Sequence, residues 1–163
     1  MDEQVADRVL KALARGLEAD RLAASGQFDE ALRIHREEAL PVFEQAGDGR
    51  SKAVTQGKMA DLLASQGELE EALRLLREEA LPTFDTLGDL RDCAIVFDRI
   101  AFIHEIRGEW AESLRVRQEE ELPVYEKLED QAACAVTLQQ IKQLRAALEP
   151  AVEKIKGKKK KKK

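Results

Sequence analysis

Apolar residues recur every three or four positions along most of the chain, which is the spacing of one face of an α-helix. The clearest run continues straight through a proline, Pro41. Its apolar positions are Phe28, Ala31, Leu32, His35, Ala39, Val42, Phe43 and Ala46. No segment shows the apolar–polar alternation of a half-buried strand. The pattern therefore predicts an all-α protein in which this run forms one helix of about 20 residues.

The same run returns twice further along the chain. The segment "EEALPVFEQAGD" (37–48) is followed by "EEALPTFDTLGD" (78–89) and "EEELPVYEKLED" (119–130), with a period of 41 residues. Other positions that keep this period are Gly26, Gly67 and Gly108; Leu32, Leu73 and Leu114; and Ala53, Ala94 and Ala135. Agreement at this many positions predicts a tandem repeat whose units bury their apolar faces against one another.

Each repeat carries a proline inside its helical pattern, at Pro41, Pro82 and Pro123. A proline removes one backbone hydrogen bond and clashes with the carbonyl four residues earlier. We expect one long helix bent at the proline, so that it can follow the curve of a stack. The alternative is a true break, with the proline as the first residue of a new short helix.

The sequence also predicts the conformation of the turn after each long helix. Gly47 and Gly88 can take the left-handed conformation that ends a helix, and Asp48 and Asp89 can cap the next one. The third repeat has Glu129 in place of the glycine. Because a side chain disfavours that conformation by roughly 1–2 kcal/mol, we expect the third turn to be looser or differently shaped.

These signals divide the chain into a repeat domain and a tail. Residues 12–26 align with residues 53–67, so the chain opens with the second helix of a unit. The predicted parts are an opening helix (3–25), repeats at about 26–66, 67–107 and 108–148, and a flexible lysine-rich tail (149–163). The second helices of the repeats are expected at 51–66, 91–107 and 132–148, which makes seven helices in all.

Residues 58–73, "KMADLLASQGELEEAL", resemble the tetratricopeptide repeat through Ala60, Leu63, Gly67, Leu69 and Ala72. The classical repeat has 34 residues. The longer unit here resembles the subclass found in kinesin light chains and in bacterial regulators with helical-repeat sensor domains. The resemblance covers residues from about 5 to 148. It implies an all-α, right-handed α–α superhelix, a solenoid of about 3.5 helix-turn-helix repeats.

Members of this family bind peptides or proteins in a concave groove lined by the helix before the central glycine. Mapped onto this sequence, the resemblance implies a partner-binding groove that contains Val54, Lys58, Asp61, Ile95, Asp98, Arg99, Phe102, Gln139 and Gln140. Gly16 and Asp20 take the matching positions in the opening helix. Ile95 and Phe102 have a second reading, as side chains buried by neighbouring helices.

The charges along the chain are unevenly distributed. The last ten residues carry eight lysines and no acid, so removing them from a net charge of −5 leaves −13 on residues 1–153. The run from Lys158 to Lys163 (Lys158, Lys159, Lys160, Lys161, Lys162 and Lys163) could bind nucleic acid or an anionic membrane, fold back on the acidic body, or be an added tag. No apolar run approaches the length of a membrane span, and no signal pattern opens the chain. We expect a cytoplasmic protein with Cys93 and Cys134 as free thiols.

The sequence contains no recognisable catalytic or metal-binding motif. We interpret His35 and His104 as buried structural residues, since a metal site needs three or four converging ligands. The acid pairs before each proline recur in every repeat and are read as a solvated face. No cofactor is predicted.

The favoured function is a non-catalytic module that binds a peptide or helix of a partner protein in its groove. The alternative is a polyanion-binding accessory that acts through the lysine tail. An enzyme is the third class weighed, and nothing in the sequence points to one. A monomer is favoured because the last helix is polar, and an end-to-end dimer is the alternative.

Overall fold

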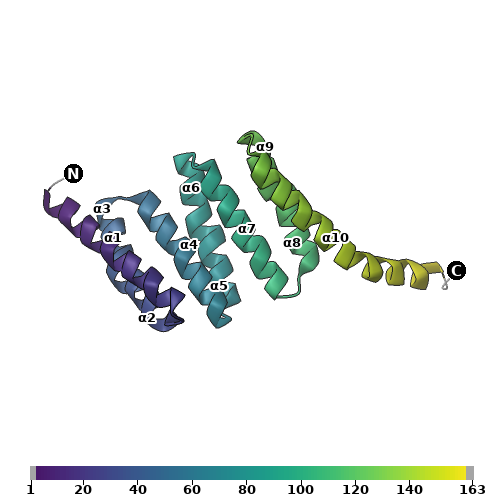
Figure 1. Ribbon diagram of the computed structural model, residues 1–163, viewed down its shortest axis with the longest axis horizontal. Coiled ribbons are helices and arrows are strands. Elements are labelled where there is room, and N and C mark those ends of the chain that lie inside the picture. Colours follow the sequence, from purple (N-terminus) through teal and green to yellow (C-terminus); the bar gives the residue numbers. More distant parts are fainter. Residues whose placement is uncertain (1–2, 161–163) are drawn as a thin grey trace. The chain divides into compact units, whose positions relative to one another are not determined.

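A computed structural model of the protein describes the backbone of residues 3–160 and the side chains of residues 3–149. Within residues 3–160 the structure is all-α, with seven helices that follow one another in sequence (Figure 1). Three of them, the composite helices, combine two α-helical parts with a π-helical segment. The elements are α1 (Glu3–Ala24); the first composite helix, α2 (Phe28–Arg33), η1 (Ile34–Ala39) and α3 (Leu40–Ala46); α4 (Gly49–Gln66); the second composite helix, α5 (Leu69–Arg74), η2 (Leu75–Ala80) and α6 (Leu81–Leu87); α7 (Leu90–Ile106); the third composite helix, α8 (Trp110–Val116), η3 (Arg117–Glu121) and α9 (Leu122–Lys127); and α10 (Gln131–Lys160).

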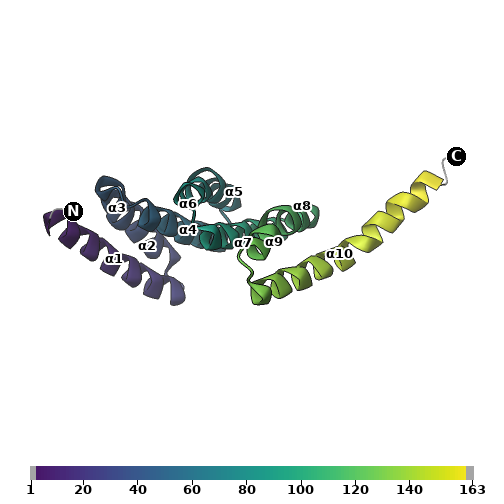
Figure 2. The same ribbon diagram turned by 90° about the horizontal axis from the view of Figure 1, so that it is seen from above.

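The helices form two compact units that divide between Asp89 and Leu90. In the first unit, α1 packs on the first composite helix, which also contacts α4, and α4 packs on the second composite helix. In the second unit, α7 packs on the third composite helix, which in turn contacts α10. Figure 2 shows these neighbours side by side within each unit. Packing therefore follows the order of the sequence, as the tandem repeat predicts.

The prolines lie inside continuous helices, which confirms the single-helix interpretation. Just before Pro41, the N–H of Leu40 donates to the carbonyl of His35, five residues back. Leu81 and Leu122 make the same bond ahead of the other two prolines. This wider π-helical turn loosens the helix at the point where a proline ring would clash with the preceding turn. A π-helical segment before each proline is the one feature of these helices that the pattern did not reveal.

The turn after each composite helix has the same shape in all three repeats. Gly47 and Gly88 adopt the left-handed conformation, with φ of 68° and 71°. Glu129 adopts it as well, with φ of 55°. The expectation of a different third turn is therefore wrong. The bond from the Asp130 N–H to the Tyr125 carbonyl (3.1 Å) closes that turn and holds Glu129 in place.

The core of each repeat depends on small residues where helices approach closely. In the first unit one cluster joins Val9 and Ala12 of α1 to Ala39 and Phe43 of the first composite helix. A second cluster contains Ala19, Ala31, Ile34 and Leu62. The alanines recur with the repeat period, because a larger side chain would push the paired helices apart.

One arginine on each composite helix binds three glutamates of the same helix. Arg33 lies within 3.5 Å of Glu30, Glu37 and Glu38. Arg74 and Arg115 repeat this arrangement with Glu71, Glu78 and Glu79 and with Glu112, Glu119 and Glu120. The first acid of each pair before the proline is exposed, as expected for a solvated face, but the second is partly buried against its arginine. Ion pairs this close to solvent contribute little stability each.

The last helix is longer than predicted. Its backbone continues to Lys160, whereas the sequence suggested an end near residue 148. Lysine and alanine are both good helix formers, and no capping glycine stands at the expected end. Lys158, Lys159 and Lys160 lie in this helix, and Lys161, Lys162 and Lys163 fall outside the described residues. None of the described helices is both long and apolar enough to span a membrane.

Candidate functional site

The predicted groove residues divide between the two units. Val54, Lys58 and Asp61 lie on α4 in the first unit. The remaining six lie in the second unit, Ile95, Asp98, Arg99 and Phe102 on α7 and Gln139 and Gln140 on α10. Two of them, Val54 and Lys58, line a cavity within the first unit, and two others, Asp98 and Gln140, bind a buried arginine in the second.

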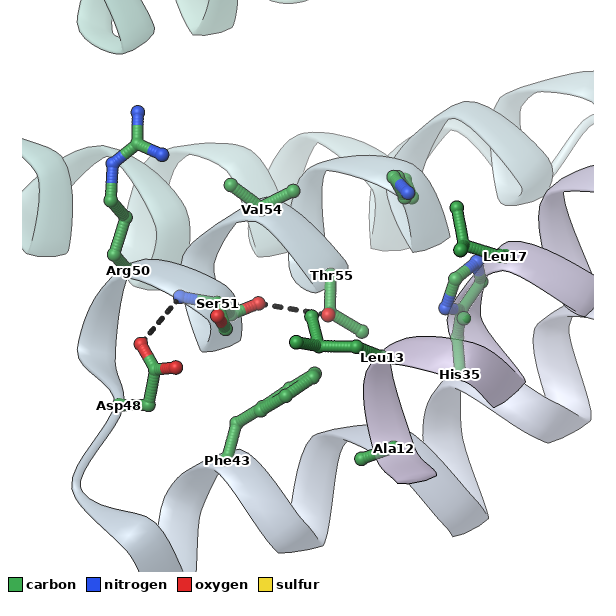
Figure 3. A pocket seen from close by; sticks show the side chains of 12 residues that line it. Ala12, Leu13, Leu17, His35, Phe43, Asp48, Arg50, Ser51, Val54 and Thr55 are labelled. Carbon is green, nitrogen blue, oxygen red and sulfur yellow. Dashed lines mark hydrogen bonds between the residues drawn. The ribbon is translucent and has the colours of Figure 1, made fainter. Parts of the chain in front are cut away.

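The first-unit cavity has a volume of about 630 Å³ and lies between α1, the first composite helix and α4. Its wall is largely apolar, with Ala12, Leu13 and Leu17 from α1, Phe43 from α3 and Val54 from α4. Figure 3 shows Leu13, Phe43 and Val54 on three different helices around this space, with Leu17 and His35 at one end. A concave, mostly apolar space of this size is typical of a binding pocket.

The start of α4 sets one end of this cavity. Asp48 caps the helix by accepting a hydrogen bond from the Ser51 N–H at 3.0 Å (Figure 3). One turn later the Thr55 hydroxyl donates to the Ser51 carbonyl at 2.8 Å. This cap fixes the first turn of α4, so that Val54 and Lys58, four residues apart, share the face that borders the cavity.

The opposite end of the cavity is polar. The Lys58 ammonium lies 2.6 Å from the Asp20 carboxylate, which joins α4 to α1. The other Asp20 oxygen faces Nε2 of His35 at 3.5 Å. Burial lowers the pKa of His35, and the nearby Lys58 charge lowers it further against the opposing effect of Asp20. The imidazole is therefore neutral near pH 7.

His35 is only 2 % exposed, and its Nδ1 has no hydrogen-bond partner. The sequence correctly predicted that His35 is buried. His104, the other histidine, is bonded through Nδ1 to the Glu109 carboxylate at 2.7 Å. A buried polar atom without a partner is uncommon in folded proteins, and Oε1 of Gln56 is a second such atom among the described side chains.

The outer side of α1 carries leucines beside the cavity. Leu10, Leu13 and Leu17 are 65 %, 44 % and 59 % exposed. Their spacing of three and four places them along one stripe of the helix. Together with the cavity they form an apolar surface that a soluble domain would normally cover. The sequence mapping missed these residues, although their spacing is visible in residues 10–17.

In the second unit, Arg117 is 2 % exposed and sits at the centre of a polar cluster. Its guanidinium donates to Asp98 at 2.7 Å, to Glu121 at 2.9 Å and to Glu105 at 3.1 Å. Gln140 accepts a further bond from it at 3.1 Å. These five residues, the Arg117 cluster, connect η3 with α7 and α10. Asp98 and Gln140 therefore help to hold the buried arginine, although the Asp98 side chain itself remains 47 % exposed.

Burial shifts the titration of the cluster's two deepest groups. It raises the pKa of Glu121, against the lowering effects of the Thr137 hydroxyl (2.7 Å) and the Arg117 charge. Burial also acts to lower the pKa of Arg117, but the hydrogen bond that Arg117 donates to Asp98 and the charges of Glu121 and Asp98 outweigh it and raise that pKa. The two groups are bound to each other at 2.9 Å, so each offsets part of the cost of burying the other's charge.

A comparison of repeat positions would have revealed this cluster. Arg117 stands where the other repeats have His35 and Leu76, and Glu121 stands where they have Ala39 and Ala80. All four of those residues are buried. Two charged residues at core positions of one repeat, four residues apart, indicate an internal ion pair.

Most of the remaining predicted groove residues are exposed to solvent, as a binding surface requires. Phe102 is 55 % exposed and Ile95 is 37 % exposed on α7, so neither is the buried core residue of the alternative reading. Gln139 and Asp61 are exposed, and Arg99 is partly buried. None of these five residues is among those that line the first-unit cavity.

The described side chains form no candidate metal site. No group of three or more His, Cys, Asp or Glu residues among them could hold a metal ion. Cys93 and Cys134 form no disulfide, as predicted.

No protein-family model matches the sequence, and a search of curated proteins finds no match.

Proposed function

We propose that the protein is a non-catalytic interaction module of the tetratricopeptide-like type, in which the helices stack as a superhelix and a partner's peptide or helix docks on an apolar surface. The observation that carries this proposal is the first-unit cavity, with the exposed leucines of α1 at its edge. Apolar pockets with a polar end are what amphipathic helices and extended peptides use as anchor sites. The 41-residue repeat and the sequential packing of seven helices in residues 3–160 support the repeat-protein part.

The electrostatics of the second unit support a non-catalytic role. Its buried charged groups Arg117 and Glu121 bind each other within the core. We place the protein in the cytoplasm, where unbridged cysteines such as Cys93 and Cys134 are the rule.

The test is a comparison of proteins captured from the source organism by matched variants. Leu13→Asp/Leu17→Asp places charge at the cavity, and Leu87→Asp places one on another exposed leucine, at the end of α6. Partners held by the wild type and by Leu87→Asp, but lost by the double variant, support the proposal. Capture that survives the double variant contradicts it, provided that circular dichroism shows unchanged helix content.

A second candidate function rests on the charge of the C-terminus. Eight lysines in ten residues attract polyanions, and such binding weakens steeply as salt rises. Replacing residues 158–163 by glutamine should abolish binding to anionic vesicles or to RNA if the tail acts in this way. Binding that is unaffected by the replacement, or by 500 mM salt, would exclude the tail as the binding element.

A further inference from the structure

A second cavity, with a volume of about 270 Å³, lies within the second unit. This second-unit cavity is lined by residues of α7, α8 and α10, namely Glu105, Trp110, Gln140, Gln143, Leu144 and Ala147. Trp110 is 43 % exposed and the Glu105 side chain is 33 % exposed, so both reach solvent. Glu105 is the only charged residue in the lining. An occupant of the second-unit cavity therefore meets an accessible aromatic ring and an accessible carboxylate.

The charge of Glu105 is only partly neutralised within the fold. Its hydrogen bonds from the described side chains, two from Arg117 and one from Ser113, all reach the same oxygen, Oε1. Arg117 also donates to Asp98 and Glu121. One positive charge is therefore shared among three carboxylates, which leaves a formal charge of −2 on this group. Because the Arg117 guanidinium does not line the second-unit cavity, the local charge there favours a cation.

The tryptophan and the acid occur together only in this repeat. The position of Trp110 holds Phe28 and Leu69 in the other repeats, and the position of Glu105 holds an alanine in both α1 and α4. The repeat fold itself therefore requires neither a tryptophan nor an acid at these positions. A tryptophan ring attracts a cation placed over its face, and a carboxylate accepts hydrogen bonds from it.

The shape of the lining selects between the two basic side chains. Arginine is planar, so it can stack on an aromatic ring while its N–H groups point outward to several acceptors. The acceptors in the second-unit cavity are the carboxylate of Glu105 and the side-chain amides of Gln140 and Gln143. Lysine offers a compact charge that is more strongly hydrated and does not stack.

We propose that the second-unit cavity binds an arginine side chain of the partner's peptide, with the guanidinium against the Trp110 ring and donating to Glu105. This assignment rests on the proposed function, since it names a charged anchor of the peptide in addition to the apolar surface of the first unit. The charge of −13 on residues 1–153 attracts a peptide that carries such a basic residue.

The sequence supplies matched variants for testing this assignment. Trp110→Phe and Trp110→Leu introduce the residues that the first and second repeats carry at this position. Glu105→Gln removes the charge but keeps a carbonyl oxygen for Arg117 and Ser113. Glu109→Gln is the control, because it removes a charge next to Trp110 in the sequence and Glu109 is not part of the lining.

The experiment titrates the full chain with ethylguanidinium, which represents an arginine side chain, and with ethylurea, its uncharged analogue. Trp110 is the only tryptophan, so its fluorescence reports on the cavity directly. For the Trp110 variants, ¹H–¹⁵N NMR of the Gln140 and Gln143 side-chain amides replaces fluorescence. We expect ethylguanidinium to bind about tenfold more tightly than ethylurea. This preference should disappear in Glu105→Gln and persist in Glu109→Gln, and the affinity should fall from Trp110 through Trp110→Phe to Trp110→Leu.

Four results would overturn the assignment. Equal binding of ethylurea would show that the cavity does not select a cation, and equal binding of propylammonium would show that it does not select arginine. A preference retained in Glu105→Gln would place the binding carboxylate elsewhere. Unchanged affinity in Trp110→Leu would exclude the ring, and this variant decides the question if circular dichroism shows that Glu105→Gln alters the fold. Failure here is separable from failure of the proposed function, because the leucine variants test partner capture at the first unit.

Discussion

Replacing Arg117 with leucine is expected to destabilise the second unit strongly. Arg117 and Glu121 are each 2 % exposed, and the arginine donates a hydrogen bond to this glutamate at 2.9 Å. Without it, Glu121 keeps one hydrogen bond, from Thr137, and must either lose its charge or hold it in the core. Removing one partner of a buried ion pair costs about 3–5 kcal/mol. The outer members Asp98 and Glu105 remain in contact with water, so we expect a value near 3 kcal/mol.

The double variant Arg117→Leu/Glu121→Ala should recover most of this loss, because it restores the residues that Leu76 and Ala80 provide in the second repeat. Urea unfolding followed by circular dichroism measures each free energy of unfolding. Arg115→Leu, two residues away on the solvent side, is the control and should cost about 1 kcal/mol or less. The reasoning is refuted if Arg117→Leu costs no more than Arg115→Leu, or if the double variant is as unstable as the single one.

Three further outcomes follow from the fold. Glu129→Gly should raise the free energy of unfolding by about 1 kcal/mol, because the left-handed turn no longer strains a side chain, and thermal melting would show no gain if the turn is not left-handed. Burial lowers the pKa of His35, so the unfolded chain takes up a proton first as pH falls below about 6.5, and stability declines towards pH 5. His35→Leu should flatten that decline in urea titrations, whereas an unchanged slope would mean that the imidazole is not desolvated. Hydrogen bonds from the Ala133 N–H and then from Arg91 lower the pKa of Asp130, so its carboxylate stabilises the fold when it is charged. Asp130→Ala should therefore reduce the urea midpoint at pH 7, and should reduce it less at pH 3, where the carboxylate becomes protonated.

Much of the fold could be predicted because local signals repeat. The glycine after each helix, the Asp48 cap and the apolar spacing through Pro41 each act within a few residues of the chain. The same signals failed at Glu129, where the backbone hydrogen bonds of the turn hold a conformation that a side chain disfavours. The π-helical segments were also missed, since a helix with one wider turn has almost the same apolar spacing.

The candidate site was harder to predict, since it depends on depth and on which helices meet. Val54 and Lys58 were chosen by resemblance and do border the cavity, but Leu13 and Leu17 on the neighbouring helix were not considered. His35 was correctly expected to be buried, yet the sequence cannot show that its Nδ1 lacks a partner. Asp98 was placed in a groove because the pattern gives its position on α7, but not the arginine that approaches it from η3.

The Arg117 cluster also bears on how a repetitive chain avoids pairing with the wrong copy of itself. The three composite helices are similar enough that η3 could dock on α4 during folding, in the place of η2. The residue of α4 that matches Asp98 is Gly57, which offers no carboxylate to Arg117. Docking in that frame would leave the buried guanidinium only Glu121 of its own helix, without the two carboxylates that the native partner α7 supplies, Asp98 and Glu105. The pair of Arg117 and Glu121 thus favours docking of the third composite helix on α7 over docking on α4. Exchanging this pair with Leu76 and Ala80, its counterparts in the second repeat, should make misassembled species accumulate during refolding.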